Sequence, residues 1–249
     1  MARLLTFAML LAATTAFADD PPAAPKLSAQ EILAKMEAAN NGFADQQMEI
    51  RLTVIDTDGS KKSYDMTMFQ KGEKRMIQFT SGEMKGMSTL VEDRNSVHVY
   101  LPGFKKVRRV AAHNMNQSMA GSDLTSEDMA QVSWVADWNV ALEKEDDSSW
   151  WLALTPKPDA NTEYSKVVHR VSKKGFIQQE THYFNKPGEE VKRFINNDPT
   201  DFHGAIRCKN IIVSDPRTGH RTELEVKDFK VNQNLKDELF TVRQLQWGK

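Results

Sequence analysis

The sequence of 249 residues has one cysteine, almost no net charge and no long apolar run. A lone Cys208 excludes an internal disulfide and a thiolate zinc cluster, and we expect it to be a small buried apolar residue rather than a reactive one. Lys and Arg number 33 against 34 Asp and Glu, so the chain lacks the basic excess that binding to nucleic-acid phosphates requires.

Signatures of catalysis are also missing. The chain contains no Gly-x-Ser-x-Gly elbow, no His-Glu-x-x-His motif and no glycine-rich phosphate loop. Its six histidines lack the spacing of metal ligands, and the carboxylates at 145–147 are typical of a solvated turn. We therefore expect no enzyme, no cofactor and no metal site, and favour a binding or carrier role.

The N-terminus has the pattern of a secretory signal peptide over residues 1–18. Arg3 precedes a short apolar stretch, and Ala16-Phe17-Ala18 supplies the small residues of a cleavage site before Asp19. Because Asp19 is not a cysteine, the mature chain cannot carry the N-terminal lipid of a bacterial lipoprotein. We expect a soluble periplasmic protein, exported by a cleavable signal, with a proline-rich extended segment at 19–27.

A helix is predicted to follow this segment. Ser28 and Glu31 have the spacing of a capping box, and Leu27 and Ile32 that of a hydrophobic staple. Apolar residues then recur at helical spacing until the run Asn40-Asn41-Gly42 ends the helix. The helix is amphipathic, so its apolar stripe is expected to cover another part of the fold.

Most of the remaining chain alternates apolar and polar residues with a period of two. Asp58-Gly59, Lys71-Gly72, Lys174-Gly175 and Pro187-Gly188 mark turns, and turns 13 residues apart favour antiparallel hairpins. About ten strands are predicted, in one antiparallel sheet that must curl. The predicted strands cover 47–54, 64–68, 75–79, 87–91, 97–101, 104–110, 150–154, 166–171, 176–183, 190–194, 205–214 and 221–231. Residues 28–249 are thus expected to form a single, mainly β domain.

Residues 111–131 interrupt this pattern. Thr125 and Asp128 could cap one helical turn within the segment. So long a stretch without strand pattern is either a functional lid or an ordered surface loop. For the lid we single out Met115, Met119 and Met129. A last short helix is predicted at 235–240.

Methionine is concentrated in the first half of the chain, with nine of twelve between residues 48 and 129. Ordinary core packing explains any one of them. Together, flexible thioether side chains suit a surface that repacks around apolar ligands, and each buried methylene of an acyl chain contributes about 0.8 kcal/mol. The predicted lining of such a cavity is Met48, Met66, Met68, Met76, Phe79, Met87, Trp134 and Trp138.

A basic cluster follows Pro102-Gly103-Phe104. Lys105, Lys106, Arg108 and Arg109 are either a charged edge strand that resists aggregation or a patch for lipid head groups or an acidic partner surface.

The stretch from Leu101 to Arg109, with Gly121-Ser122-Asp123 and Glu127-Asp128, resembles the outer-membrane lipoprotein-sorting family, which is similar to LolA and LolB. The resemblance extends from Ser28 to Phe240 and implies a strongly curved, open antiparallel half-barrel with an N-terminal helix and short lid helices. Leu124 and Ser126 stand where family members tend to have aromatic residues. No position matches a cargo-gating arginine.

Together these features favour a periplasmic carrier or chaperone. Its cargo would be a lipid or lipid-modified protein, held by its acyl chains for transfer toward the outer membrane. One alternative is an accessory periplasmic subunit of an inner-membrane exporter of the resistance-nodulation type. A second alternative is a sensor of lipoprotein stress.

Overall fold

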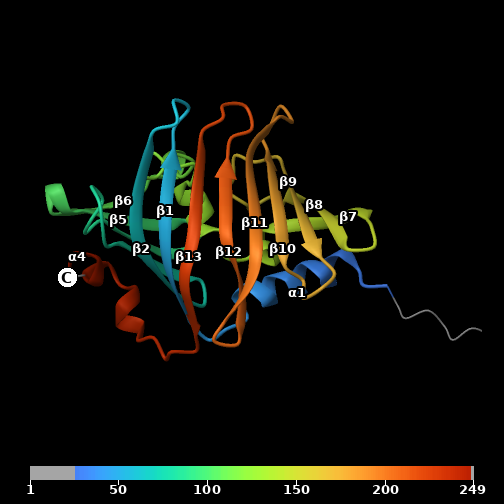
Figure 1. Ribbon diagram of the computed structural model, residues 1–249, viewed down its shortest axis with the longest axis horizontal. Helices are drawn as coiled ribbons and strands as arrows, with labels where there is room; N and C mark the ends of the chain where they lie inside the picture. The colour runs from blue at the N-terminus through green and yellow to red at the C-terminus, as the bar shows by residue number, and fades with distance from the viewer. Residues whose placement is uncertain (1–25, 248–249) are drawn as a thin grey trace, which may run out of the picture.

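The computed structural model describes residues 26–247, so the predicted signal peptide and most of the segment at 19–27 lie outside the described residues. The fold is mainly β, with a single open sheet of thirteen antiparallel strands in the order β6-β5-β4-β3-β2-β1-β13-β12-β11-β10-β9-β8-β7 (Figure 1). This confirms the predicted fold class. Twelve of the strands correspond to the predicted ranges, and one, at 138–145, was not predicted.

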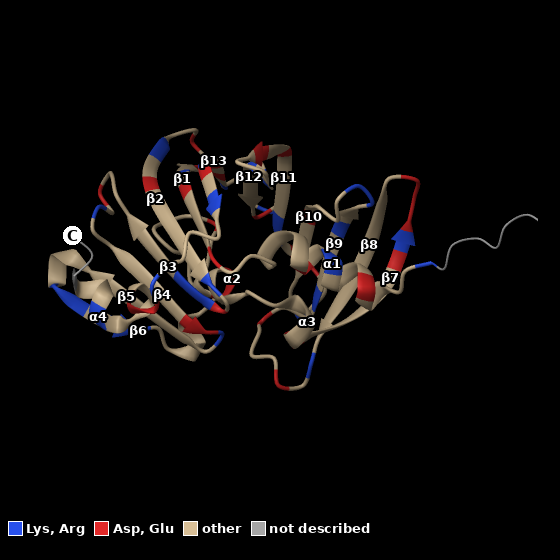
Figure 2. Ribbon diagram, turned by 90° about the horizontal axis from the view of Figure 1, so that it is seen from below, with Lys and Arg blue, Asp and Glu red and all other residues tan. Residues whose placement is uncertain are grey.

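Two hairpin meanders make up the sheet. The first contains β1 (Gln46–Ile55), β2 (Lys61–Lys71), β3 (Lys74–Phe79), β4 (Ser88–Asp93), β5 (Ser96–Leu101) and β6 (Lys106–Arg109). The second contains β7 (Trp138–Glu145), β8 (Ser149–Pro156), β9 (Lys166–Ser172), β10 (Gln178–Phe184), β11 (Glu190–Phe202), β12 (Ala205–Ser214) and β13 (Arg221–Val231). They join where β1 pairs with β13 in the middle of the sheet. The sheet is arched, with α1 (Ala29–Asn41), α2 (Ser126–Ala130) and α3 (Trp134–Asp137) on its concave side, which we call the hollow (Figure 2).

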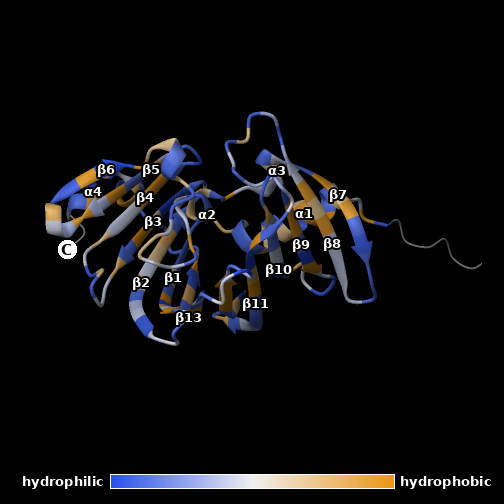
Figure 3. Ribbon diagram, turned by 90° about the horizontal axis from the view of Figure 1, so that it is seen from above, coloured by the Kyte–Doolittle hydropathy of each residue, from blue (hydrophilic) through white to orange (hydrophobic). Residues whose placement is uncertain are grey.

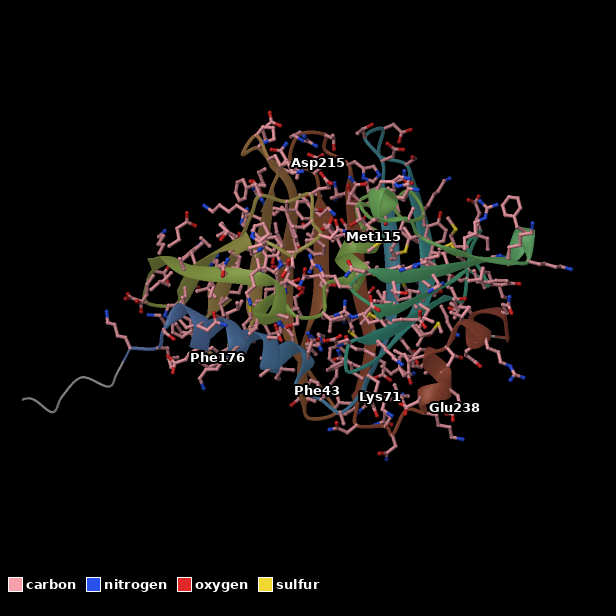
Figure 4. The ribbon with its side chains drawn as sticks, turned by 180° about the vertical axis from the view of Figure 1, so that it is seen from behind. Phe43, Lys71, Met115, Phe176, Asp215 and Glu238 are labelled. Atoms are coloured by element: carbon pink, nitrogen blue, oxygen red, sulfur yellow. The ribbon has the colours of Figure 1, made fainter. Side chains whose placement is uncertain are left out.

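Residues 110–137 connect the outermost strands of the two meanders and must therefore run across the hollow. We call this the crossing segment. It contains η2 (Ala112–Asn114), α2 (Ser126–Ala130) and α3 (Trp134–Asp137), and in Figure 4 it lies in front of the strands with Met115 labelled. The capping box predicted from Thr125 and Asp128 is present at α2.

Helix α1 (Ala29–Asn41) also lies in the hollow, against α3 and β7. Both hydrogen bonds of the predicted capping box form: Ser28 Oγ accepts from Glu31 N at 3.2 Å, and Glu31 Oε2 accepts from Ser28 N at 2.8 Å. Ile32 and Leu33 are fully buried in a cluster that also contains Leu27 and Trp138. The apolar stripe thus covers the second meander.

The C-terminal residues cover the opposite face of the first meander. The helix predicted at 235–240 is a 3₁₀ turn, η3 (Asp237–Phe240), followed by α4 (Val242–Trp247). Phe240 and Leu245 are buried there against Met76 and Leu90. In strands β3 and β4 (Figure 3), Met76 and Leu90 directly precede Ile77 and Val91, so both faces of this part of the sheet bury apolar side chains.

Candidate functional site

A cavity of about 280 Å³ lies between the hollow face of the sheet and the crossing segment. Its floor is apolar, with side chains from β1, β2 and β3 on one side and from β12 and β13 on the other. Leu124, Met129 and Trp134 close it from the crossing segment, and Tyr183 and Phe194 come from the second meander. The floor residues are Met48, Ile50, Met66, Met68, Ile77, Ile211, Leu224 and Val226.

Half of the predicted lining residues are in this wall: Met48, Met66, Met68 and Trp134. Alternation along the strands explains the first three, because Met48 pairs with Met68 and Ile50 with Met66 across β1 and β2, on the hollow face. Whether these side chains bind a ligand stays a prediction.

The other four predicted residues lie outside the wall. Met76 precedes Ile77, so strand alternation turns it to the opposite face, where Phe240 and Leu245 cover it. Phe79 and Met87 are on the hollow side but pack in a core near the strand end, with Phe79 edge-on to Tyr64. Trp138 is buried behind Trp134, with ring centroids 5.7 Å apart.

The predicted lid residues also separate. Met129 lines the cavity, whereas Met115 packs on Val91 and Val97, and Met119 packs in the core of the first meander. Met115 and Met119 therefore hold the crossing segment on the sheet rather than face the cavity.

Several polar contacts attach the crossing segment to the sheet. At 121–123, the Asp123 carboxylate accepts from Thr222 Oγ1 at 2.8 Å and lies 2.9 Å from His220 Nδ1, both near the start of β13. Arg75 of β3 donates from Nη1 to the carbonyl oxygens of Met129 at 2.9 Å and Gln131 at 3.3 Å. The contact of Asp123 with β13 gives the Gly-Ser-Asp motif at 121–123 a structural role.

The third contact is a buried ion pair. Lys192 Nζ of β11 lies 2.6 Å from Asp128 Oδ2, with the two side chains 9% and 5% exposed. The ammonium also lies 5.6 Å from the ring centre of Tyr164 and 5.9 Å from that of Tyr183. Burial, with the nearby Asp128 charge, raises the pKa of both phenols, so they stay neutral around the pair. The segment is therefore bonded to both meanders.

Charged groups at the cavity were not predicted from the sequence. Arg75 and Arg207 both line it, together with the buried amides of Gln46 and Gln70. A signal existed: Arg75 shares strand phase with Ile77 and Phe79, and Arg207 with Ile211 and Val213. An arginine in the apolar phase of a strand points toward the buried side.

The predicted basic patch is at the outer edge of the first meander. Phe104 ends the turn η1 (Pro102–Phe104), Lys105 follows it, and Lys106, Arg108 and Arg109 lie on β6 (Figure 2). All four cations are exposed. Phe104 is 69% exposed, and the Arg108 guanidinium lies 6.0 Å from its ring centre. Among the described residues, no carboxylate forms an ion pair with any of the four cations.

Cys208 is buried beside Arg207, and burial raises the pKa of its thiol, as expected for a structural cysteine. Within residues 26–247, no group of three or more His, Cys, Asp or Glu side chains is placed to hold a metal ion. No helix within the same range is long and apolar enough to cross a membrane.

Comparison with families and solved structures assigns the fold. A family model described as an uncharacterized protein matches residues 71–247. The chain belongs to that family. No curated protein matches the sequence.

Three crystal structures are similar over nearly their full length. A DUF1329 family protein from Desulfovibrio piger has a TM-score of 0.81 at 22% identity, covering 87% of this chain and 97% of its own. A putative outer membrane lipoprotein-sorting protein domain from Vibrio parahaemolyticus has a TM-score of 0.76 at 18% identity, and the match covers 88% of this chain and 98% of that one. A LolA superfamily protein from Nitrosomonas europaea has a TM-score of 0.74 at 21% identity, and the match covers 88% of this chain and 100% of that one. The family member described here thus has a LolA-like fold, which confirms the resemblance drawn from its sequence.

Proposed function

We propose that this LolA-like protein is a periplasmic carrier that holds the acyl chain of a lipid or of a lipid-modified protein in the cavity under the crossing segment. The cavity supports this proposal most directly: its floor is apolar and includes flexible methionines, and the crossing segment, attached by polar contacts, lies over it. Burial of hydrocarbon there needs no catalysis, because each methylene removed from water contributes about 0.8 kcal/mol. The N-terminal signal pattern and the lipoprotein-sorting domain of similar fold agree with transfer toward the outer membrane.

Filling the cavity should abolish binding. Met68 is half-buried on its floor, so Met68→Trp adds an indole to the space that a chain would occupy. We expect affinity for a neutral hydrophobic fluorophore to fall by about tenfold or more, and co-purifying lipid to disappear from native mass spectra. The measurements are fluorescence titration and native mass spectrometry of the protein from periplasmic extracts.

Thr67→Trp is the matched control, since Thr67 adjoins Met68 on the opposite face of β2. It should leave affinity within about twofold of the parent. Equal loss in both variants, or no binding by the parent, would count against the carrier.

We further propose that Phe104 and the basic patch contact an anionic bilayer surface during transfer. An exposed aromatic ring among unpaired cations suits an interface with apolar and negatively charged layers, where each cation contributes about 1 kcal/mol.

The double variant Lys105→Gln, Lys106→Gln should therefore lose about tenfold or more in binding to vesicles that contain phosphatidylglycerol. Co-sedimentation at low and high salt measures this. The matched control, Lys61→Gln with Lys62→Gln, removes two exposed cations from the hairpin between β1 and β2 and should bind like the parent. Unchanged binding in the first variant would refute a bilayer contact here.

A further inference from the structure

A chain of polar side chains crosses one end of the apolar cavity. Arg207 Nη2 of β12 donates to Gln46 Oε1 of β1 at 2.8 Å, and Gln46 Nε2 donates to Gln70 Oε1 of β2 at 2.8 Å. Arg75 Nε of β3 donates to the same Gln70 oxygen at 2.9 Å. Two guanidinium groups are thus joined through two buried, neutral amides.

Neither guanidinium has a carboxylate partner. Arg207 otherwise donates only to Asn40, at its side-chain oxygen and its carbonyl, and Arg75 only to carbonyls of the crossing segment. No Asp or Glu among residues 26–247 forms an ion pair with either.

Two carboxylates do line the cavity, but both are engaged elsewhere. Glu37 accepts from Ser133 Oγ at 2.9 Å, Trp134 N at 2.7 Å and Val135 N at 3.0 Å, at the start of α3. Asp128 pairs with Lys192.

The two cations are held at a cost. Burial lowers the pKa of Arg207 to about 10, and burial together with the Arg207 charge lowers that of Arg75 to about 10. Both remain protonated at neutral pH. Arg207 Nε is buried and has no hydrogen-bond partner. Uncompensated charge and an orphaned donor in an apolar site are unfavourable unless something anionic occupies the site.

We propose that the cavity binds a single-chain amphiphile with an acidic head, a carboxylate or a phosphate, with the head at Arg207 and the hydrocarbon tail along Met48, Met66 and Met68. This deepens, and rests on, the proposed carrier function. An anion there gains charge-assisted hydrogen bonds and neutralises part of the buried charge. The cavity volume is about 280 Å³, and one water takes about 30 Å³ of liquid volume. The cavity therefore has room for fewer than ten water-sized groups, which suits one hydrocarbon chain rather than several.

The test is displacement of the neutral fluorophore N-phenyl-1-naphthylamine from the full mature chain at pH 7.5. Three competitors share one tail: decanoate, decyl phosphate and 1-decanol. We expect at least one of the two anions to bind about tenfold tighter than decanol. In Arg207→Met this preference should shrink to about twofold or less, with decanol affinity unchanged. Arg51→Met is the matched control, because Arg51 is a half-exposed arginine on β1 that pairs with Asp65.

The outcomes separate the inference from the function on which it rests. Preference for decanoate identifies a carboxylate head, and preference for decyl phosphate a phosphate head. Equal binding of decanol and both anions overturns the acidic head and leaves the carrier standing. Failure of the parent to bind the fluorophore overturns both. If Arg207→Met does not fold, the parent comparison still decides, and Arg207→Gln serves as the second variant.

Discussion

Replacing Lys192 by methionine is expected to lower the free energy of unfolding by about 3–5 kcal/mol, because it leaves the Asp128 carboxylate buried and unpaired. The Asp128 carboxylate would keep only the hydrogen bonds that Thr125 N and Oγ1 donate to its Oδ2 atom, while its Oδ1 atom is already buried without a partner. The loss should also free α2 from β11 and raise hydrogen exchange across 125–131. Urea unfolding with linear extrapolation measures the first effect, and exchange mass spectrometry the second.

Lys166→Met provides the matched control. Lys166 pairs with Glu143 at 2.9 Å, but the two side chains are 38% and 44% exposed, so its loss should cost under about 1 kcal/mol. The double variant Asp128→Leu, Lys192→Met should recover part of the stability, because no charge is then buried alone. Similar losses from Lys166→Met and Lys192→Met would show that burial does not set the strength of the pair.

Acidification should destabilise the protein through His169. This side chain is fully buried, lies edge-on to Trp134 with centroids 4.4 Å apart, and has its Nδ1 within 3.0 Å of Thr181 Oγ1. Burial, with a smaller effect of the His182 charge, lowers the pKa of His169 to about 3.

The sign follows from proton uptake. An unfolded histidine has a pKa of about 6.5. Between pH 6.5 and about pH 3, His169 is therefore protonated in the unfolded chain but neutral in the folded one. Stability is therefore retained above this window and lost as pH falls through it, by up to about 1.4 kcal/mol per pH unit.

Urea unfolding from pH 6.5 to 4.5 measures the slope, and His169→Leu should flatten it whatever its effect at neutral pH. His203→Gln, at an exposed histidine beside Asp228, should keep the parent slope. A slope that survives His169→Leu would assign the acid sensitivity to other groups.

Alternation in the sequence predicted most strands because one face of each is buried, and β12 and β13 were placed at their observed ends. Strand β7 was missed. Trp138, Val140 and Leu142 alternate in its first half, but only Trp138 is buried, and residues 143–145 of this edge strand are exposed and charged. The apolar alternation is therefore too short to mark a strand. The strand predicted at 104–110 is shorter because Pro102–Phe104 form a 3₁₀ turn, with Lys105 at a φ of 50° after it.

The sequence indicated an apolar cavity lined by methionines, but not all of its lining residues. Methionines on β1 and β2 reach it because their phase was clear, whereas the prediction for Met76 ignored that Ile77 holds the inward phase in β3. In the polar chain from Arg207 to Arg75, the link from Arg207 of β12 to Gln46 of β1 spans 161 residues of sequence, so no local pattern shows it. The Lys192–Asp128 pair likewise depends on the crossing segment passing over β11.

The pairing of β1 with β13 has a consequence for how the molecule is made. Gln46 meets Val231, so the seam at the centre of the sheet joins the earliest and latest strands. A nascent or translocating chain can form either meander from local hairpins. It cannot pair β1 with β13 until β13 has emerged. Contacts so distant in sequence form slowly, and two unpaired apolar edges stay exposed meanwhile. Substitutions along this seam are thus expected to affect yield and aggregation before they affect the finished protein.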